Sequence, residues 1–380
     1  MRYGRWEVIE ELGRGGQGIA YRVIDSSKVD VEKLVAEVHA AFGKMRVNTS
    51  DEQQRSYSLE LLSLLERYLG RHGPENTAAL KVLRPDLPDA QKARQRLKEE
   101  VNVVSKLNHP SLLKVLDSQI DEGWLVMPLY TEGTLATQQG RFAGKPTEAL
   151  QSFRSLLEGV AELHKRSIVH RDIKPENIFV VEDKLVLGDF GIAYVDDAGH
   201  TRVSDTYENV GSRDWMPPWA MGRRVEVRPS FDVCSLGKVL WAMVSGRTKL
   251  PLWYWEKAEF NLLRLFPLDE RMAWINNLLR GSVRQKEEDT WPTATQFLER
   301  VDGTLSILRR GGQVFKGMYR ACRVCGVGVY ELLVGDDNHT ARRNLRLDTG
   351  QKIRVFQCGY CGHLDLFRMT ENPLAWPRPE

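Results

Sequence analysis

The chain has 380 residues, of which 42% are hydrophobic and 28% charged, with a formal net charge of +3. This length exceeds one average domain, and the composition is that of a core-forming protein, which excludes a disordered or fibrous chain. The nearly balanced charge gives no attraction of the whole molecule to nucleic acid or to an anionic membrane. No apolar run reaches the roughly 18 residues of a membrane span, and the N-terminus lacks the apolar core of a secretory signal. We therefore expect a cytoplasmic protein with no membrane partner.

The first hundred residues are predicted to form strands and one charged helix, with a helical segment between the second and third strands. Apolar residues recur at helical spacing across 26–77, which predicts two helices that end at Gly43 and at Gly73-Pro74. The apolar faces of these helices need a partner, and we expect them to pack on the neighbouring sheet; a docking surface for another protein is the alternative. The predicted strands are 6–12, 19–24 and 78–83, and the charged helix is 89–107.

The remainder of the chain divides into two parts. Strands alternate with turns up to Met127, and the sequence to about Leu308 is mostly helical. Gly311-Gly312 resembles a hinge, and beyond it the composition changes to cysteine pairs, glycines and short β-type runs. We therefore expect one domain over 1–310 and a small module over 311–380.

A glycine-rich turn lies between the first two predicted strands, with the pattern Gly13-x-Gly15-x-x-Gly18. Glycines at these positions let backbone N–H groups close over phosphates without obstruction by side chains. A plain hairpin turn is the alternative interpretation. Because the turn joins a strand to a strand and not to a helix, it does not predict a Rossmann dinucleotide site.

A lysine on the third predicted strand has two candidate partners on the helix that follows. Lys81 lies in the run Ala-Ala-Leu-Lys, and Glu100 and Glu99 both lie on the helix. An ion pair from Lys81 to Glu100 would fix the ammonium group for the α- and β-phosphates of a nucleotide. We favour Glu100, with Glu99 as the competing candidate.

Two further motifs follow in the same order along the chain. The run His-Arg-Asp-Ile-Lys-Pro-Glu-Asn covers 170–177, and Asp-Phe-Gly covers 189–191. With the glycine-rich turn and Lys81, this order resembles the protein kinase family over about residues 6–305, in the form that phosphorylates serine and threonine. The resemblance implies an α+β, two-lobed fold with a β-rich N-terminal lobe and a helical C-terminal lobe, into which 26–77 is an insertion.

The resemblance also implies roles for particular residues. Asp172 would orient the attacking hydroxyl or accept its proton, and Lys174 would stabilise charge on the transferring phosphoryl group. Asn177 and Asp189 would hold two Mg²⁺ ions. The residues that it places around ATP are Gly13, Gly15, Gly18, Ala20, Ala79, Lys81, the gatekeeper Met127 and Leu129 in the segment that follows.

The run Asp-Val-Cys-Ser-Leu-Gly at 232–237 carries two residues of note. Asp232 matches the family's aspartate that anchors the backbone of the catalytic loop. Cys234 is expected to be a buried apolar residue and not a reactive thiol.

The chain departs from the family at the end of the activation segment. The family has an ion pair between a glutamate there and an arginine in the late helices, and this chain has Trp219 and Trp291 at the two positions. Because replacing both partners of a buried pair by apolar groups can be neutral, we expect the two indoles to contact each other.

The activation loop leaves two alternatives open. Ser212 stands where the family has threonine, and Glu208 lies close to the usual phosphorylation site. Either Glu208 supplies a permanent anion for Arg171, or a neighbouring hydroxyl is phosphorylated. The candidate hydroxyls are Thr201, Ser204, Thr206 and Tyr207.

Four of the five cysteines form two CxxC-Gly pairs near the C-terminus, which favours metal ligation in a reducing compartment over disulfides. Four thiolates make a closed tetrahedral zinc site of a structural kind, with His363 and His339 outside it; a redox pair or an iron–sulfur cluster is the alternative. Ten Lys/Arg and seven Asp/Glu from Gln313 onward are a mild basic excess, so nucleic acid is a less favoured partner. The predicted ligands are Cys322, Cys325, Cys358 and Cys361.

Every catalytic position of the family is filled, which favours an active kinase. We expect ATP- and Mg²⁺-dependent transfer of the γ-phosphoryl group to a hydroxyl of a protein substrate, with autophosphorylation. A docking partner for the inserted helices or the zinc ribbon is a further expectation. The alternative is a scaffold, or a module that senses nucleic acid or protein through the zinc ribbon, with weak kinase activity.

Overall fold

Two units make up the chain, one formed by 1–108 with 112–131 and the other by 109–111 with 132–380. The structure is a computed structural model. It describes residues 1–15, 18–27, 31–45, 50–71, 76–191, 193–195, 213–221, 226–309, 318–322, 324, 329–334, 353–358 and 361–368.

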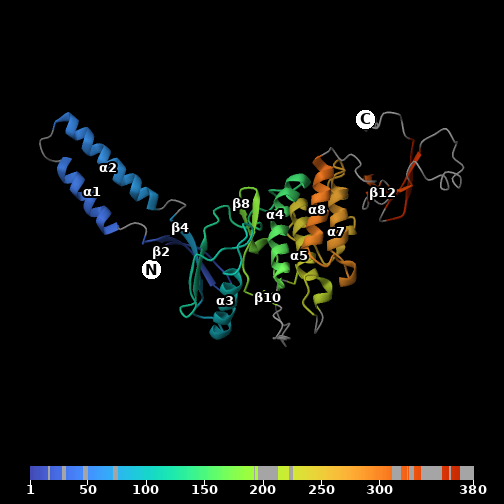
Figure 1. Cartoon of the computed structure of the whole chain (residues 1–380), viewed down its shortest axis with the longest axis horizontal. Helices are drawn as coiled ribbons and strands as arrows, with labels where there is room; N and C mark the ends of the chain where they lie inside the picture. The colour runs from blue at the N-terminus through green and yellow to red at the C-terminus, as the bar shows by residue number, and fades with distance from the viewer. Residues whose placement is uncertain are drawn as a thin grey trace. The chain divides into compact units, whose positions relative to one another are not determined.

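The first unit is built on an antiparallel sheet of six strands in the order β1-β2-β3-β4-β6-β5 (Figure 1). The three predicted strands are confirmed to within two residues at each end, and the short β1 was not predicted. The strands are β1 (Arg2–Tyr3), β2 (Trp6–Arg14), β3 (Gly18–Asp25), β4 (Thr77–Leu83), β5 (Asp117–Gln119) and β6 (Trp124–Pro128).

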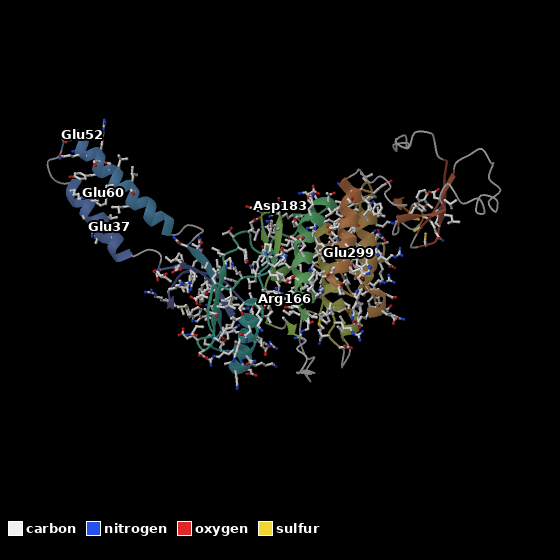
Figure 2. All side chains as sticks on the ribbon, viewed as in Figure 1. Glu37, Glu52, Glu60, Arg166, Asp183 and Glu299 are labelled. Atoms are coloured by element: carbon white, nitrogen blue, oxygen red, sulfur yellow. The ribbon has the colours of Figure 1, made fainter. Side chains whose placement is uncertain are left out.

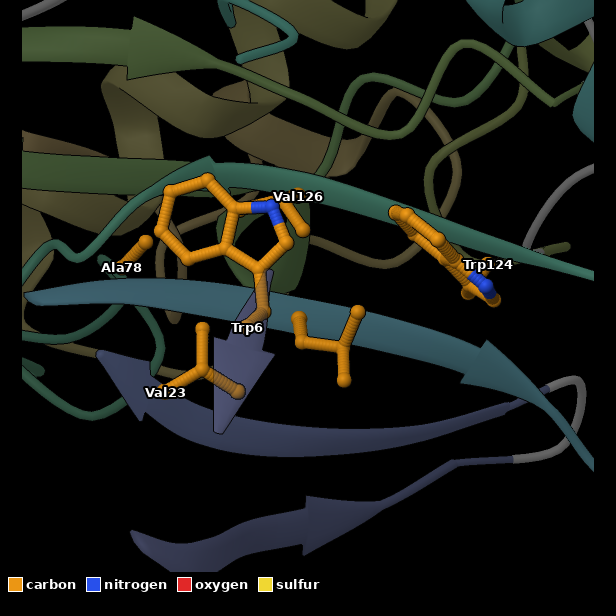
Figure 3. Close-up of a cluster of buried hydrophobic side chains, with 6 residues drawn as sticks. Trp6, Val23, Ala78, Trp124 and Val126 are labelled. Atoms are coloured by element: carbon orange, nitrogen blue, oxygen red, sulfur yellow. The ribbon is translucent and has the colours of Figure 1, made fainter. Parts of the chain in front are cut away.

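One face of this sheet carries a small apolar core around Trp6 (Figure 3). Alternate residues of a strand point to opposite faces, so Ala78 and Leu80 of β4 reach this core while Ala79 and Lys81 do not. The Trp6 indole nitrogen donates a hydrogen bond of 2.9 Å to Asp117, so its polar edge is satisfied although the ring is buried. The core comprises Trp6, Val23, Ala78, Leu80, Trp124 and Val126.

Helices α1 (Val31–Met45) and α2 (Asp51–Arg71) lie between β3 and β4 and pack on each other. Their contact buries Ala41 and Leu64, and Lys44 of α1 forms an ion pair of 3.1 Å with Glu60 of α2. Figure 2 shows Glu37 on α1 and Glu60 on α2. Each helix therefore packs on the other helix. The sequence had favoured packing of both helices on the neighbouring sheet. Large apolar side chains remain exposed on this hairpin at Val35, Phe42, Leu59 and Leu62.

The helical hairpin joins the sheet at the end opposite the glycine-rich turn. Gly18 begins β3, whereas the hairpin follows Asp25 at the other end of that strand. The Asp25 carboxylate is buried and accepts hydrogen bonds from the backbone N–H and hydroxyl of Ser27, and its own N–H donates to the Asn76 carbonyl. These bonds fix both ends of the inserted segment to the sheet.

Helix α3 (Ala90–Val104) corresponds to the predicted charged helix. It begins at Asp89, whose side chain accepts a hydrogen bond of 2.8 Å from the Lys92 N–H and so satisfies one of the unpaired donors of the first turn. Among its residues, the buried ones include Leu97 and Glu100.

The second unit is mostly helical, and Figure 1 shows α4, α5, α7 and α8 as a bundle. Edge-to-face packing of Phe153 on Phe297, with ring centres 5.5 Å apart, joins α4 to α8. None of the helices in the described part of the chain combines the length and apolarity that crossing a membrane requires. The helices are α4 (Pro146–Lys165), α5 (Ser230–Ser245), α6 (Leu262–Leu265), α7 (Met272–Ser282) and α8 (Ala294–Arg309).

Short strands complete this unit. Two of the pairs are β7 (Ile168–Val169) with β10 (Tyr194–Val195) and β8 (Ile178–Val181) with β9 (Lys184–Leu187). A four-stranded antiparallel sheet near the C-terminus consists of β11 (Met318–Ala321), β12 (Val329–Val334), β13 (Ile353–Cys358) and β14 (Leu364–Arg368).

The predicted contact between Trp219 and Trp291 is wrong. Trp219 packs on a cluster that includes Met216 and Phe231, whereas the Trp291 ring lies 5.1 Å from the ring of Phe297. Trp291 also covers Gly281 of α7, where an added Cβ would overlap the indole ring. The two tryptophans therefore make separate apolar contacts.

Candidate active site

The residues predicted to surround a nucleotide's base and phosphates share one face of the first unit's sheet. Ala20 of β3 stands opposite Lys81 of β4, and Ala79 stands opposite Met127 of β6. Directly opposed residues of antiparallel strands point to the same face, and so do residues two apart on one strand. The four side chains therefore lie together on the face opposite the Trp6 core. Leu129 follows directly after β6 and is half-buried.

Lys81 and Glu100 form an ion pair on this unit, with 3.0 Å between the ammonium nitrogen and Glu100 Oε2. The alternative, Glu99, accepts a hydrogen bond of 2.8 Å from Gln95, one turn earlier on α3. The two glutamates are adjacent, so they point about 100° apart around the helix axis, and only Glu100 is buried.

The glycine-rich turn has one position where the fold itself requires glycine. A Cβ at Gly18 would lie 2.8 Å from the Val82 carbonyl oxygen, closer than side-chain carbons approach backbone atoms. A Cβ at Gly13 would meet no atom within 4 Å, and Gly15 donates its N–H to the Gly18 carbonyl at 2.9 Å. Close packing against β4 thus explains why residue 18 is a glycine. Packing does not require a glycine at residue 13, where a side chain would have room.

The predicted catalytic residues of the second unit converge on one carboxylate. Asp172 Oδ2 accepts a hydrogen bond of 2.7 Å from the Lys174 ammonium and one of 2.9 Å from the Asn177 amide. The same amide nitrogen donates to the Asp172 backbone carbonyl at 2.9 Å. Asn177 therefore fixes both the backbone and the side chain of Asp172.

The loop that carries Asp172 is anchored on α5 by Asp232. The two oxygens of this fully buried carboxylate accept the backbone N–H groups of His170 and Arg171 at 2.8 and 2.9 Å. The ring of His164, on α4, lies 3.1 Å from the same group. Burial opposes ionisation, but the hydrogen bond from His164 and the nearby imidazoles outweigh it, so the pKa of Asp232 lies below its usual range.

Asp189 is held beside the same loop through its neighbours. The Gly188 carbonyl lies 3.1 Å from the His170 ring nitrogen, and the Gly188 N–H donates to the Asn177 carbonyl at 2.9 Å. Phe190 packs edge-to-face on His170, with ring centres 4.8 Å apart. Asp189 has φ +59°, a left-handed conformation that costs free energy in a residue other than glycine and that is common at functional sites.

Sequence reasoning missed His164 as part of this arrangement. Its second ring nitrogen accepts the Ala294 N–H at the start of α8, at 3.1 Å, so this one residue joins α8 to the aspartate under the catalytic loop. A histidine in the last turn of an amphipathic helix was the available signal.

A family model of the protein kinase domain matches residues 67–300, which is more than half of the chain. The chain belongs to the protein kinase family. The match begins inside α2, so the glycine-rich turn at 13–18 lies outside it, although β3 pairs with β4 and β2 pairs with β3 in the same sheet.

Several serine/threonine-protein kinases resemble this kinase domain. Pkn2 of Myxococcus xanthus is 31% identical over 191 residues, which are 48% of this chain and 23% of that protein. PrkC of Bacillus subtilis is 29% identical over 177 residues, 46% of this chain and 27% of that protein. PkaB of Streptomyces coelicolor is 30% identical over 189 residues, 46% of this chain and 44% of that protein. Each match thus spans less than half of the relative's length.

Three of the four predicted zinc ligands of this kinase family member gather in the C-terminal sheet. The sulfurs of Cys322, Cys358 and Cys361 all lie within 4.8 Å of one another, and those of Cys322 and Cys361 are 3.7 Å apart. Tetrahedral zinc with Zn–S bonds of about 2.3 Å places its sulfurs about 3.8 Å apart, so the geometry fits the metal. Cys325 lies outside the described residues.

The second CxxC pair is followed by a glycine in a left-handed conformation. Gly362 has φ +74° and donates its N–H to the Cys358 carbonyl at 3.0 Å. Tyr330, fully buried on β12, accepts a hydrogen bond from the Cys322 thiol at 3.6 Å, a contact that sequence reasoning missed. The activation-loop residues predicted to bear or replace a phosphate (Thr201, Ser204, Thr206, Tyr207, Glu208 and Ser212) and His339 also lie outside the described residues.

Proposed function

We propose that this chain is an ATP- and Mg²⁺-dependent serine/threonine protein kinase that also phosphorylates itself. The observation that carries the proposal is the convergence of Lys174 and Asn177 on the Asp172 carboxylate, in a kinase-family chain. In the reaction a bond forms between the acceptor hydroxyl oxygen and the γ-phosphorus, and the bond from that phosphorus to the bridging oxygen of ADP breaks.

Asp172 supports this transfer by orientation and by accepting the hydroxyl proton. Its backbone and one carboxylate oxygen are fixed by Asn177, so the carboxylate keeps its direction when a hydroxyl arrives. Lys174, 2.7 Å away, supplies a positive charge that neutralises the anionic phosphoryl group as it moves. By the family resemblance, a lysine at this position is typical of kinases that act on serine and threonine and is not expected in small-molecule kinases.

Asn177 and Asp189 are the residues that would hold Mg²⁺. The Asn177 nitrogen faces Asp172, which leaves its amide oxygen for a cation, and carboxylate and amide oxygens are suitable ligands for this ion. When bound, Mg²⁺ neutralises the phosphate oxygens. The backbone bond from Gly188 to Asn177 ties the two ligands to each other.

The first unit supplies groups for nucleotide recognition. The apolar side chains of Ala20, Ala79 and Met127 suit the face of an adenine ring, and the Glu100 carboxylate holds the Lys81 ammonium for phosphate. The cysteine module, proposed to span 311–380, would bind one structural Zn²⁺ through Cys322, Cys358 and Cys361 with Cys325 as the fourth ligand.

The experiment that tests this function compares the native chain with Asp172→Asn by mass spectrometry after incubation with ATP and Mg²⁺. Asparagine keeps the size and hydrogen-bonding oxygen of the side chain, so the fold should persist while phosphoryl transfer falls more than about a hundredfold. Phosphate incorporation by the variant within threefold of native would refute the mechanism, and none by either protein would refute the function.

A further inference from the structure

The hairpin of α1 and α2 has a small core for two helices of this length. In the described part of their contact, Ala41 and Leu64 are the buried side chains. Val38 and Leu61 are half-buried beside them. Helices of 15 and 21 residues gain most of their stability from the packing of an apolar face, and this contact supplies little of it. The hairpin therefore needs a further surface to pack on.

Four large apolar side chains of the hairpin are turned to solvent. Val35 and Phe42 lie seven residues apart on α1, so they point in almost the same direction. Leu59 and Leu62 lie three residues apart on α2, so they are neighbours on its surface. The exposed fractions of the four range from 44% for Val35 to 67% for Leu59. We call these four residues the apolar stripes of the hairpin.

The neighbouring sheet does not cover the apolar stripes. The apolar core of the sheet consists of strand residues, and the cluster inside the hairpin consists of helix residues. Among the described side chains, the two clusters have no member in common. A surface that covers the apolar stripes must therefore come from outside the described part of this chain.

The charge of the hairpin is compatible with a second copy of itself. Helices α1 and α2 carry five basic and six acidic residues, which give a net charge of −1. Two of these charges, those of Lys44 and Glu60, are paired within the hairpin at 3.1 Å. Repulsion between two copies is therefore small, and no strong field selects a partner of opposite charge.

The size of the hairpin fits the same partner. As cylinders about 22 and 31 Å long and about 10 Å wide, the two helices offer about 800 Å² on one side of the hairpin. A stable protein interface buries about 800 Å² on each partner. Two antiparallel hairpins that pack side against side form a four-helix bundle, in which each hairpin supplies half of the core.

We propose that the hairpin is a dimerisation element, in which the apolar stripes pack on those of a second copy of this chain and the four helices form a bundle. The interface is isologous, so each substituted residue is present in it twice. The proposal goes beyond the proposed kinase function and does not depend on it, because α1 and α2 carry none of the catalytic or nucleotide-binding residues proposed above.

The test measures the mass of the full chain by sedimentation equilibrium, from nanomolar to high micromolar concentration. Native protein should be a dimer at micromolar concentration. Phe42→Glu and Leu62→Glu should each raise the dissociation constant of the dimer at least about tenfold, because each places two carboxylates in an apolar interface. The double variant should raise it at least about a hundredfold. Both side chains are exposed in a single copy, so the fold of the hairpin should persist.

Two further variants complete the design. Leu268→Glu, at a fully exposed leucine of the second unit, is the matched control and should leave the dissociation constant unchanged. In a shortened chain, a tight turn replaces 28–75. The Asp25 N–H bonds to the Asn76 carbonyl at 3.0 Å, so the two ends of this segment already lie together, and the shortened chain should be a folded monomer. If Phe42→Glu or Leu62→Glu loses helical circular dichroism, the shortened chain decides.

Native protein that remains a monomer at high micromolar concentration would overturn the proposal. A dimer whose dissociation constant is the same in the double variant and in the shortened chain would overturn it too, because the interface would then lie elsewhere. A native monomer that instead binds another protein or phosphatidylcholine vesicles through the hairpin has a different occupant on the apolar stripes, which also overturns the proposal. Each of these outcomes leaves the proposed kinase function intact, since Asp172→Asn tests that function separately.

Discussion

The Lys81 ammonium lies 3.0 Å from Glu100 Oε2, and only 3% of the Glu100 side chain is exposed. Lys81 itself is 20% exposed, so water screens the pair only in part. Lys81→Met would leave the Glu100 carboxylate buried without this cation. We expect it to lower the free energy of unfolding by about 3 kcal/mol, since breaking a buried pair from one side is costly.

The double variant Lys81→Met/Glu100→Leu separates this stability effect from function. With both charges removed, most of the lost stability should return, whereas phosphoryl transfer should remain absent. Urea unfolding followed by tryptophan fluorescence measures the first quantity, and Lys98→Met, at an exposed site of α3, is the control. A loss below about 1 kcal/mol in Lys81→Met would show that the pair behaves like an exposed one.

Lys238 of α5 is buried and donates to the Asp214 and Met216 carbonyls, and its burial predicts a particular pH dependence of stability. Desolvation lowers its pKa in the folded chain, and the neighbouring Cys234 and Asp214 act in the opposite direction without reversing the shift. Between the folded pKa and the unfolded value of about 10.4, the unfolded chain binds more protons, so native stability rises with pH. The free energy of unfolding of Lys238→Met, relative to that of the native chain, should therefore be largest at neutral pH and fall as the pH approaches about 10.

Unfolding curves at several pH values, each compared with Lys184→Met at an exposed site of β9, measure this trend. A neutral amine still has two N–H groups, so both carbonyl bonds of Lys238 survive its deprotonation. If the free energy of unfolding of Lys238→Met, relative to that of the native chain, instead increased with pH, the pKa of Lys238 would not be lowered in the folded chain.

The cysteine cluster predicts one equivalent of Zn²⁺ per chain by elemental analysis. The Tyr330 hydroxyl lies 3.6 Å from the Cys322 sulfur and can donate to it once the thiol is a zinc-bound thiolate, so Tyr330→Phe should weaken zinc binding about tenfold in a chelator competition without changing the stoichiometry. His363→Ala is the matched control: that ring lies against Tyr330 but outside the sulfur cluster, and zinc affinity should persist. Zinc lost from His363→Ala would show that the histidine is a ligand.

Packing of Trp291 on Gly281 predicts a coupled pair of substitutions. A Cβ at residue 281 would overlap the indole ring, so Gly281→Ala should destabilise the chain by about 1–3 kcal/mol through overpacking. In the background of Trp291→Ala the same change should cost much less, because the space is then free. Equal costs in both backgrounds would rule out the contact. Gly303→Ala, where a Cβ meets no atom within 4 Å, is the control in α8.

Much of the candidate site follows from sequence because its residues are close along the chain. Asp172, Lys174 and Asn177 are close neighbours in the sequence, so the local backbone conformation brings their side chains together. Ala79 and Lys81 are two residues apart on one strand, so the alternation of side chains places them on the same face. The buried character of Cys234 is confirmed as well; burial raises its pKa to about 11.

Contacts between distant segments could be decided only by the tertiary structure. The position of Glu100 around the axis of α3 directs it, and not Glu99, to Lys81. Trp219 and Trp291, which the sequence predicted to touch, pack on different neighbours. Nothing in the sequence indicated that Lys238 would bond to the carbonyls of Met216 and Asp214, which lie 22 and 24 residues before it. Local spacing determines which side of an element a residue occupies, but the partner on that side depends on how the elements pack, and a single sequence does not encode that packing in any short pattern.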